Sequence, residues 1–170
     1  MTEHSSQNGP VDEVDRIVEA WGRELPDLDV APLHVLSRIS RLSRHLELAR
    51  RGAFDANDLE PWEFDVLSAL RRVGEPYEMS PSELVHETLS TSGTMTNRLV
   101  RLEARDYVTR HRDPRDGRGT RVCLTEAGRA AAEATLTTLV ERERDLLEGL
   151  DADDQRDLAV LLRRLLISFD

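Results

Sequence analysis

The side chains with the most evident chemical use in this sequence are arginines gathered in one short segment. Between Arg98 and Arg121 there are eight arginines against four acidic residues, a formal charge of +4. The other 146 residues carry 15 arginines and 29 acidic residues, a formal charge of −14. Because a guanidinium donates two parallel hydrogen bonds to a phosphate or a guanine edge, this distribution favours one local surface for nucleic acid. The complete absence of lysine is equally explained by a GC-rich genome.

Two short helices in tandem are expected to carry the first of these arginines. Residues 80–83, Ser-Pro-Ser-Glu, contain two helix-start signals: a serine cap with glutamate three residues later, and proline at the first helical position. After Thr88-Leu89-Ser90 a second helix begins. Its periodicity places Met95, Leu99 and Leu102 on the inner face and Thr94, Arg98, Arg101 and Arg105 on the outer face. Such a pair with a basic outer face is the helix-turn-helix pattern.

The beginning of the second helix is rich in small polar side chains. A recognition helix enters the major groove by its N-terminal end, where short side chains approach base edges and the helix dipole favours phosphate. Arg101 is placed for a phosphate or a guanine. The candidate DNA contacts are therefore Ser90, Thr91, Ser92, Thr94, Thr96, Asn97 and Arg101. A capped helix with a solvated face explains the serines and threonines equally well.

A β-hairpin is predicted next, because the hydrophobic period changes. Residues 107–112 and 120–124 are short and rich in valine, threonine and tyrosine, and residues 113–119 are turn formers. Arg115 and Arg118 at the tip are expected to lie over the minor groove, with Asp113 or Asp116 orienting Arg118. The alternative is a solvated loop tip of mixed charge.

The remaining sequence predicts helices with apolar stripes. They span residues 11–25, 31–51, about 58–74 with Asp58 as the N-cap, 125–149, and a last helix capped by residues 151–154. The outer helices have little central core to cover, so we expect them to pack against a second copy with two-fold symmetry. The expected fold is mainly α: a winged helix-turn-helix with N- and C-terminal dimerisation helices.

These expectations divide the chain into four parts by role. Residues 1–10 are expected to be a flexible tail, and residues 11–51 to be N-terminal helices for dimerisation and a ligand pocket. Residues 52–129 are expected to form the winged helix-turn-helix DNA-binding region. Residues 130–170 are expected to form the C-terminal dimerisation helices.

Several other classes of protein find little support. No apolar run of membrane-spanning length and no secretory signal is present, so we expect a cytoplasmic protein with no membrane partner. The histidines have no metal-binding spacing, and no catalytic motif or cofactor-binding glycine loop is found, which argues against an enzyme, a metal site or a cofactor. Cys123 is expected to be a packed residue, with a redox sensor as the alternative. A winged helix used only for protein contacts stays open as the second rival.

The chain resembles the MarR family from about Leu59 to Arg129. The resemblance is carried by the helix-turn-helix, by residues 113–118 (Asp-Pro-Arg-Asp-Gly-Arg) and by residues 124–128 (Leu-Thr-Glu-Ala-Gly). Residues 62–72, residues 91–99 and an extra N-terminal helix are similar to the PecS or urate-responsive subgroup. Gly117 departs from the pattern, since many members have a basic residue there, so affinity at the wing is expected to depend on Arg118 and Arg115.

That subgroup resemblance implies a ligand site at Trp21, Asp65, Arg72 and Arg98. It implies a small anionic effector, such as urate or a polycarboxylate, that releases a dimeric repressor from a palindromic operator on double-stranded DNA. Asp65 and Arg72 lie two helical turns apart on one face, where an ordinary structural ion pair is the alternative. By spacing alone, a tryptophan such as Trp21 is more often a core residue than a platform for a ligand.

Overall fold

The computed structural model describes residues 11–113 and 119–169. The chain divides into two units at Glu47 and Leu48, and each unit is described by itself. Helix α2 (Ala31–Ala56) begins in the N-terminal unit and ends in the C-terminal one. The role boundaries expected from the sequence, 51/52 and 129/130, fall inside α2 and inside helix α6 (Glu126–Leu146). They stay a prediction about role.

The N-terminal unit is held by a small polar cluster and a short apolar stripe. Helix α1 (Glu13–Glu24) begins with a capping box, in which the Asp12 side chain accepts from the Asp15 N–H and Asp15 accepts from the Asp12 N–H. Val14 and Val18 are the buried residues of α1. Arg38 of α2 donates to the carboxylates of Asp12 at 2.8 Å and Asp15 at 2.7 Å. The helices predicted over residues 11–25 and 31–51 are confirmed, and α2 runs one turn further.

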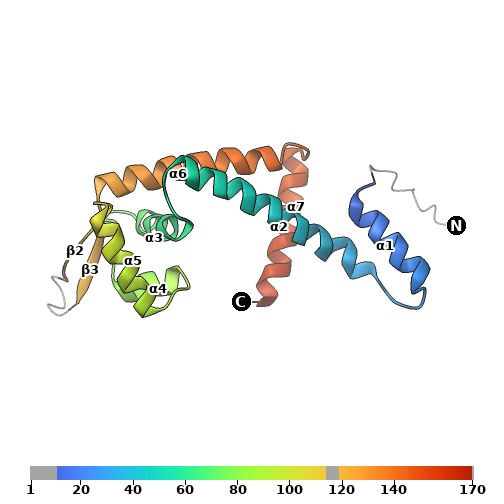
Figure 1. Cartoon of the computed structure of the whole chain (residues 1–170), viewed down its shortest axis with the longest axis horizontal. Coiled ribbons are helices and arrows are strands. Elements are labelled where there is room, and N and C mark those ends of the chain that lie inside the picture. The colour runs from blue at the N-terminus through green and yellow to red at the C-terminus, as the bar shows by residue number, and fades with distance from the viewer. Residues whose placement is uncertain (1–10, 114–118, 170) are drawn as a thin grey trace. The chain divides into compact units, whose positions relative to one another are not determined.

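The C-terminal unit contains the helix-turn-helix and the hairpin in the predicted order (Figure 1). Its elements after α2 are α3 (Pro61–Arg72), β1 (Glu78–Met79), α4 (Pro81–Glu87), α5 (Ser92–Ala104), β2 (Val108–Arg112), β3 (Thr120–Leu124), α6 (Glu126–Leu146), α7 (Ala152–Leu166) and the 3-10 turn η1 (Ile167–Phe169).

The start of α3 differs from the prediction that Asp58 caps it. Asp58 has φ 49°, a left-handed conformation, and lies in the turn that leaves α2. Glu60 is the N-cap, Pro61 is the first helical residue, and the Glu60 N–H donates to the Glu63 carboxylate at 2.9 Å. The helix therefore starts with the same proline and glutamate signals that were recognised at Ser80, where the prediction is confirmed.

The core of this unit lies where α3, α4, α5 and α6 meet the sheet. Leu67, Leu70, Leu84, Leu99 and Leu102 are fully buried in it. The three residues predicted on the inner face of α5 are all in this core. A smaller cluster of Ala53, Phe54 and Leu139 packs the end of α2 against α6.

The hairpin is part of a three-stranded antiparallel sheet in the order β1-β3-β2. Strands β2 and β3 pair from Val108↔Leu124 to Arg112↔Thr120, as the change of period predicts. Strand β1 was not predicted, and it is only two residues long. Gly128 brings α6 against this sheet, because a Cβ there would lie 2.1 Å from the Tyr107 carbonyl oxygen. The helix can approach so closely only with glycine at this position.

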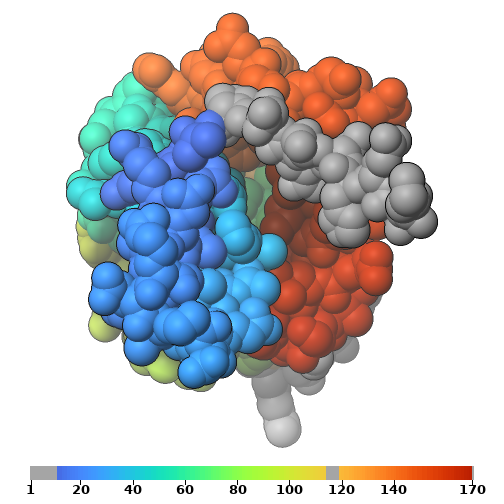
Figure 2. All heavy atoms as spheres, turned by 90° about the vertical axis from the view of Figure 1, so that its right-hand side faces the viewer, coloured from blue at the N-terminus to red at the C-terminus, as the bar shows by residue number. Residues whose placement is uncertain are grey.

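Helix α7 has no buried residue, and it lies at the surface in Figure 2 (red). Asp151 caps it by accepting from the N–H groups of Asp153 and Asp154. Its exposed apolar side chains, with those of the turn that follows, are Leu158, Val160, Leu161, Leu162, Leu165, Leu166, Ile167 and Phe169. Within the described part of the chain no helix is long and apolar enough to cross a membrane.

Candidate nucleic-acid interface and ligand site

The start of α5 presents a row of small polar side chains to solvent. Thr91 is the N-cap, and its hydroxyl accepts from the Thr94 N–H at 3.3 Å and donates to the Thr94 hydroxyl at 2.9 Å. Thr96 donates to the Ser92 carbonyl of its own helix at 3.0 Å. The residues predicted here as DNA contacts are exposed, except for Ser90, which is half-buried in the turn and pairs with Thr88: Thr91, Ser92, Thr94, Thr96, Asn97 and Arg101.

Two arginines of α5 share one aromatic ring of α3. The guanidinium carbon of Arg101 lies 4.7 Å from the centre of a Trp62 ring, and that of Arg98 lies 5.4 Å away. Both distances are in the range of a cation–π contact. Glu60 completes the group: its carboxylate accepts from the Arg101 Nη2 at 2.5 Å and from the indole Nε1 of Trp62 at 2.5 Å. The hydrogen bond from Trp62 is the largest cause that lowers the pKa of Glu60, and the hydrogen bond from Arg101 is the second. Glu60 therefore stays ionised.

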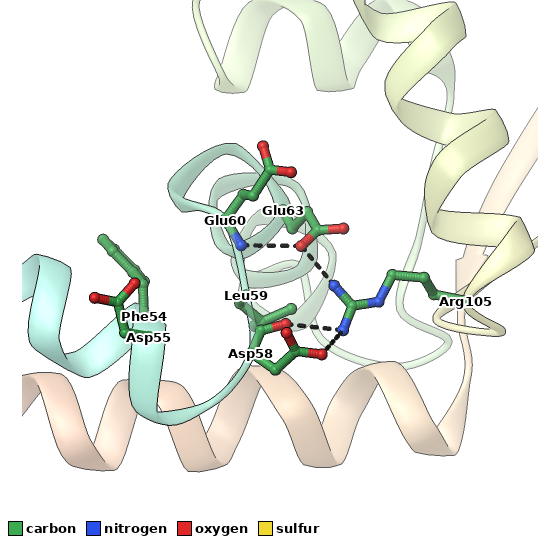
Figure 3. Close-up of a pocket in the computed structure, with 7 residues that line it drawn as sticks. All are labelled: Phe54, Asp55, Asp58, Leu59, Glu60, Glu63 and Arg105. Atoms are coloured by element: carbon green, nitrogen blue, oxygen red, sulfur yellow. Dashed lines mark hydrogen bonds and ion pairs between the residues drawn. The ribbon is translucent and has the colours of Figure 1, made fainter.

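The structure corrects the prediction that Arg105 lies on the outer face of α5. Figure 3 shows its guanidinium turned toward the α2–α3 corner, where it donates to the Glu63 carboxylate and to the Asp58 carboxylate and carbonyl, each at 2.8 Å. Glu63 is 1% exposed. A buried carboxylate requires such a partner, so Arg105 fixes the end of the recognition helix to α3.

A cavity lies next to Arg105 at the connection between α2 and α3. Its volume is about 300 Å³. Phe54, Asp55, Asp58, Leu59, Glu60, Glu63 and Arg105 line it (Figure 3). Four of these seven residues are acidic, and the only arginine among them already binds two of those acids. The lining of this cavity is therefore mainly acidic.

Asp65 and Arg72, the predicted ligand residues of α3, line one pocket of about 240 Å³. Ser68, Glu87, Thr88 and Leu89 complete it, so the turn between α4 and α5 forms its other wall. Arg72 does not bind Asp65. Its Nη2 lies 3.5 Å from the Glu87 carboxylate, and both side chains are exposed. The alternative of a structural Asp65–Arg72 ion pair is therefore wrong.

The Asp65 carboxylate has no ion pair or hydrogen bond with any described residue. Its partial removal from water raises its pKa above the ordinary value of 3.8, although the positive charges of Arg98, Arg72 and Arg50 act in the opposite direction. Arg98 is the strongest of these three charges. The pocket thus holds an unpaired carboxylate beside Arg72, and the charge of Arg98 on α5 also acts on that carboxylate.

Three of the predicted site residues stay predictions. Trp21 belongs to the N-terminal unit, where it is 48% exposed, so its part in the ligand site stays a prediction. Arg115 and Arg118 lie outside the described residues, as do Asp116 and Gly117. The base of the turn is described: the Asp113 N–H donates to the Gly119 carbonyl at 2.8 Å.

Cys123 on β3 is half-buried, and its thiol contacts the carbonyl oxygens of Pro76 and Leu124, each at 3.6 Å. Burial raises the pKa of the thiol, which makes it a poor nucleophile near neutral pH. Among the described residues no group of three or more potential ligands could hold a metal ion.

Three residues of this site were missed: Glu60, Trp62 and Glu63. A signal for Glu63 was present, since it precedes Val66, Leu67 and Leu70 by three, four and seven residues, on the buried face of α3. Its partner Arg105 is 42 residues away, and no local pattern joins them.

Comparison with known proteins decides the family. A profile described as MarR family matches residues 57–119. HTH-type transcriptional regulator PecS of Dickeya dadantii is 37% identical over 153 residues, which cover 90% of this chain and 92% of PecS. The chain belongs to the MarR family. It is therefore a winged-helix transcriptional regulator, as the sequence resemblance implied.

Two further MarR relatives are informative. HTH-type transcriptional repressor NicR of Pseudomonas putida is 30% identical over 146 residues, covering 83% of this chain and 90% of NicR. The structure of Bordetella bronchiseptica BpsR, whose DNA binding is regulated by 6-hydroxynicotinic acid, is 26% identical, with a TM-score of 0.61. It covers 76% of this chain and 91% of BpsR.

Proposed function

We propose that this MarR regulator is a repressor that binds a palindromic operator as a homodimer and is released by a small anionic ligand. The observation that carries the proposal is the placement of Asp65: it lies unpaired in a pocket with Arg72 and close to Arg98 of the recognition helix. An anion that binds there acts on the same element that reads DNA.

The DNA contacts are proposed from the exposure and chemistry of α5. Ser92, Thr94 and Asn97 face solvent at the N-terminal end of the helix, where the dipole and the short side chains suit the phosphate backbone and base edges. Arg101 is 57% exposed and is placed for a phosphate or a guanine. Arg115 and Arg118 of the wing are proposed to contact the minor groove.

The proposed dimer is supported by the apolar surface of α7. Nearly every residue of this helix is exposed, and so many leucines on one unburied helix cost free energy in water. A second copy related by a two-fold axis covers that surface and places two recognition helices on one duplex. Successive major grooves on one side of B-DNA are about 34 Å apart, so the dimer fixes the spacing of the operator half-sites.

The proposed ligand is planar or compact and carries negative charge, such as urate or a polycarboxylate. Arg72 and Arg98 supply two guanidinium groups for charge-assisted hydrogen bonds. Asp65, whose pKa is raised by its partial removal from water, has no fixed partner that an incoming ligand must displace. Trp21 is proposed to stack on the ligand from the N-terminal unit. The names of NicR, a repressor, and BpsR, regulated by an aromatic acid, support this class of function.

Release is proposed to act through Arg98. This residue now lies over the Trp62 ring and near Asp65. A bound anion competes for its guanidinium and draws the recognition helix from the spacing that two grooves require. If the ligand binds the released state more tightly than the DNA-bound state by about 1–3 kcal/mol, it weakens operator binding roughly 5- to 150-fold.

A binding assay tests this function. Fluorescence anisotropy with a duplex from the intergenic DNA upstream of its own gene, at two salt concentrations, is expected to show salt-dependent binding that urate or citrate weakens. Arg98→Ala is expected to fold, dimerise and lose most of the ligand response. Arg142→Ala, which removes an exposed arginine of α6, is the matched control for the lost charge. An unchanged response in Arg98→Ala removes Arg98 from the mechanism, and no binding by the wild type refutes DNA recognition.

A further inference from the structure

Glu60, Trp62 and Arg101 form a closed set of contacts between α5 and the start of α3. The two oxygens of Glu60 accept from different donors: one from the Arg101 guanidinium and the other from the Trp62 indole. The indole ring in turn supports the guanidinium by a cation–π contact at 4.7 Å. Arg101 is therefore held in one place by a carboxylate and a ring, which we call the Glu60–Trp62 cradle.

The cradle is exposed, so its hold on Arg101 is weak. Arg101 and Glu60 are 57% and 53% exposed, and ion pairs at such positions are screened by solvent and salt. A DNA phosphate offers the same guanidinium a charge-assisted pair that can be bidentate. Phosphate can therefore replace Glu60 at little cost.

Arg105 is held in a different way one turn further along α5. It donates to Glu63, which is almost fully buried, and to two oxygens of Asp58. Because Glu63 is buried, a DNA phosphate cannot take its place as the partner of Arg105. Of these two ion-paired arginines, only Arg101 has a partner that phosphate can replace.

We propose that Glu60 and Trp62 are positioning residues for DNA binding: without DNA they hold Arg101 over the indole ring, and a DNA phosphate replaces Glu60 when α5 docks. This inference rests on the proposed contact between Arg101 and DNA. Glu60 then competes with phosphate for one guanidinium, and the Trp62 ring keeps that guanidinium aimed at the backbone during the exchange.

A double-mutant cycle tests the cradle. Binding to the upstream duplex and to a scrambled duplex of equal length is measured for the wild type, Glu60→Gln, Arg101→Ala and the double variant. Arg101→Ala is expected to weaken binding to both duplexes about tenfold and to reduce the salt slope by about 1. Glu60→Gln is expected to tighten binding about twofold to fivefold, because phosphate no longer displaces a carboxylate. In the Arg101→Ala background Glu60→Gln is expected to change nothing.

The outcomes separate the cradle from simpler explanations. If Glu60→Gln tightens binding equally with and without Arg101, Glu60 acts only as a negative charge near DNA, and the cradle is refuted. If Arg101→Ala binds as well as the wild type, Arg101 is not a DNA contact and the cradle is again refuted, while recognition by the rest of α5 stands. Failure of the wild type to bind either duplex refutes the proposed function itself.

Tryptophan fluorescence gives a second readout that a purely structural role would not produce. The chain has two tryptophans, so in a Trp21→Phe background Trp62 is the only tryptophan, and its emission is selected by excitation beyond the absorption of tyrosine. Exchange of the Arg101 guanidinium from Glu60 to phosphate, beside the indole ring, is expected to change Trp62 emission on DNA binding. Adding Arg101→Ala is expected to abolish that change at saturating DNA, and an identical change in both variants overturns the exchange.

Discussion

Glu63 and Asp65 are two acidic residues of helix α3, separated by a single position, and the protein treats them in opposite ways. Glu63 is buried, and it accepts hydrogen bonds from the Glu60 N–H and from the Arg105 guanidinium. Asp65 reaches solvent, lines a pocket and has no ion pair within the described residues, although Arg98 and Arg72 are near enough to affect its pKa.

The difference shows which carboxylate is structural and which one is available. A buried charge is tolerated only with its hydrogen-bonding positions satisfied, so Glu63 is committed to holding α5 against α3. Asp65 has arginines around it but no fixed partner, so a ligand can rearrange them without breaking the fold. A regulator needs both kinds of site: one that keeps the recognition helix attached and one that adjusts it.

The largest expected effect comes from removing the partner of the buried acid. Arg105→Met leaves Glu63 buried without its guanidinium, and we expect the free energy of unfolding to fall by about 3 kcal/mol. Urea unfolding at one fixed protomer concentration measures it, because the stability of a dimer depends on concentration. Asp65→Asn, which changes an exposed carboxylate two positions from Glu63 on the same helix, is the control. A loss below about 1 kcal/mol in Arg105→Met would show that Glu63 does not depend on this pair.

A smaller effect is expected when the acid itself is removed. Glu63→Gln keeps the shape of the side chain and can still accept from the Glu60 N–H, while Arg105, 31% exposed, turns to Asp58 and solvent. We therefore expect a loss of about 1–2 kcal/mol, less than in Arg105→Met. The double variant should lose less than the sum of the two single losses. If Glu63→Gln is the more damaging of the two, the asymmetry argued from burial is wrong.

Most of the elements could be predicted from local sequence. The capping box at Ser80, the inner face of α5 and the two long strands follow from neighbours within four residues or from turn chemistry, and all three are confirmed. Strand β1 could not be predicted, because two residues show no period and become a strand only by pairing with β3.

The site was less predictable than the fold, for the same reason. The outer-face prediction for Arg105 is wrong because it used helical periodicity alone, and Arg105 lies just beyond the last residue of α5, where the chain turns back toward α3. The Glu60–Trp62 cradle joins residues about 40 positions apart. Its acid and aromatic ring look like ordinary helix-start residues until the two helices are packed together.

The smallest expected effect is the pH dependence of Asp65. Its pKa is raised in the folded protein, so the native state binds this proton more tightly than the unfolded chain does. The charged form therefore costs stability above the folded pKa, and that cost disappears as the pH falls through the folded pKa toward 3.8. We expect Asp65→Asn to be slightly more stable than the wild type at pH 7, by about 0.5 kcal/mol, a size common at exposed positions. Near pH 3.5 the two proteins should unfold at the same urea concentration. If the wild type is instead the more stable at pH 7, the attraction of the arginine charges outweighs the cost of removing the Asp65 carboxylate from water. Asp65 is then a structural partner like Glu63 and is not open to a ligand.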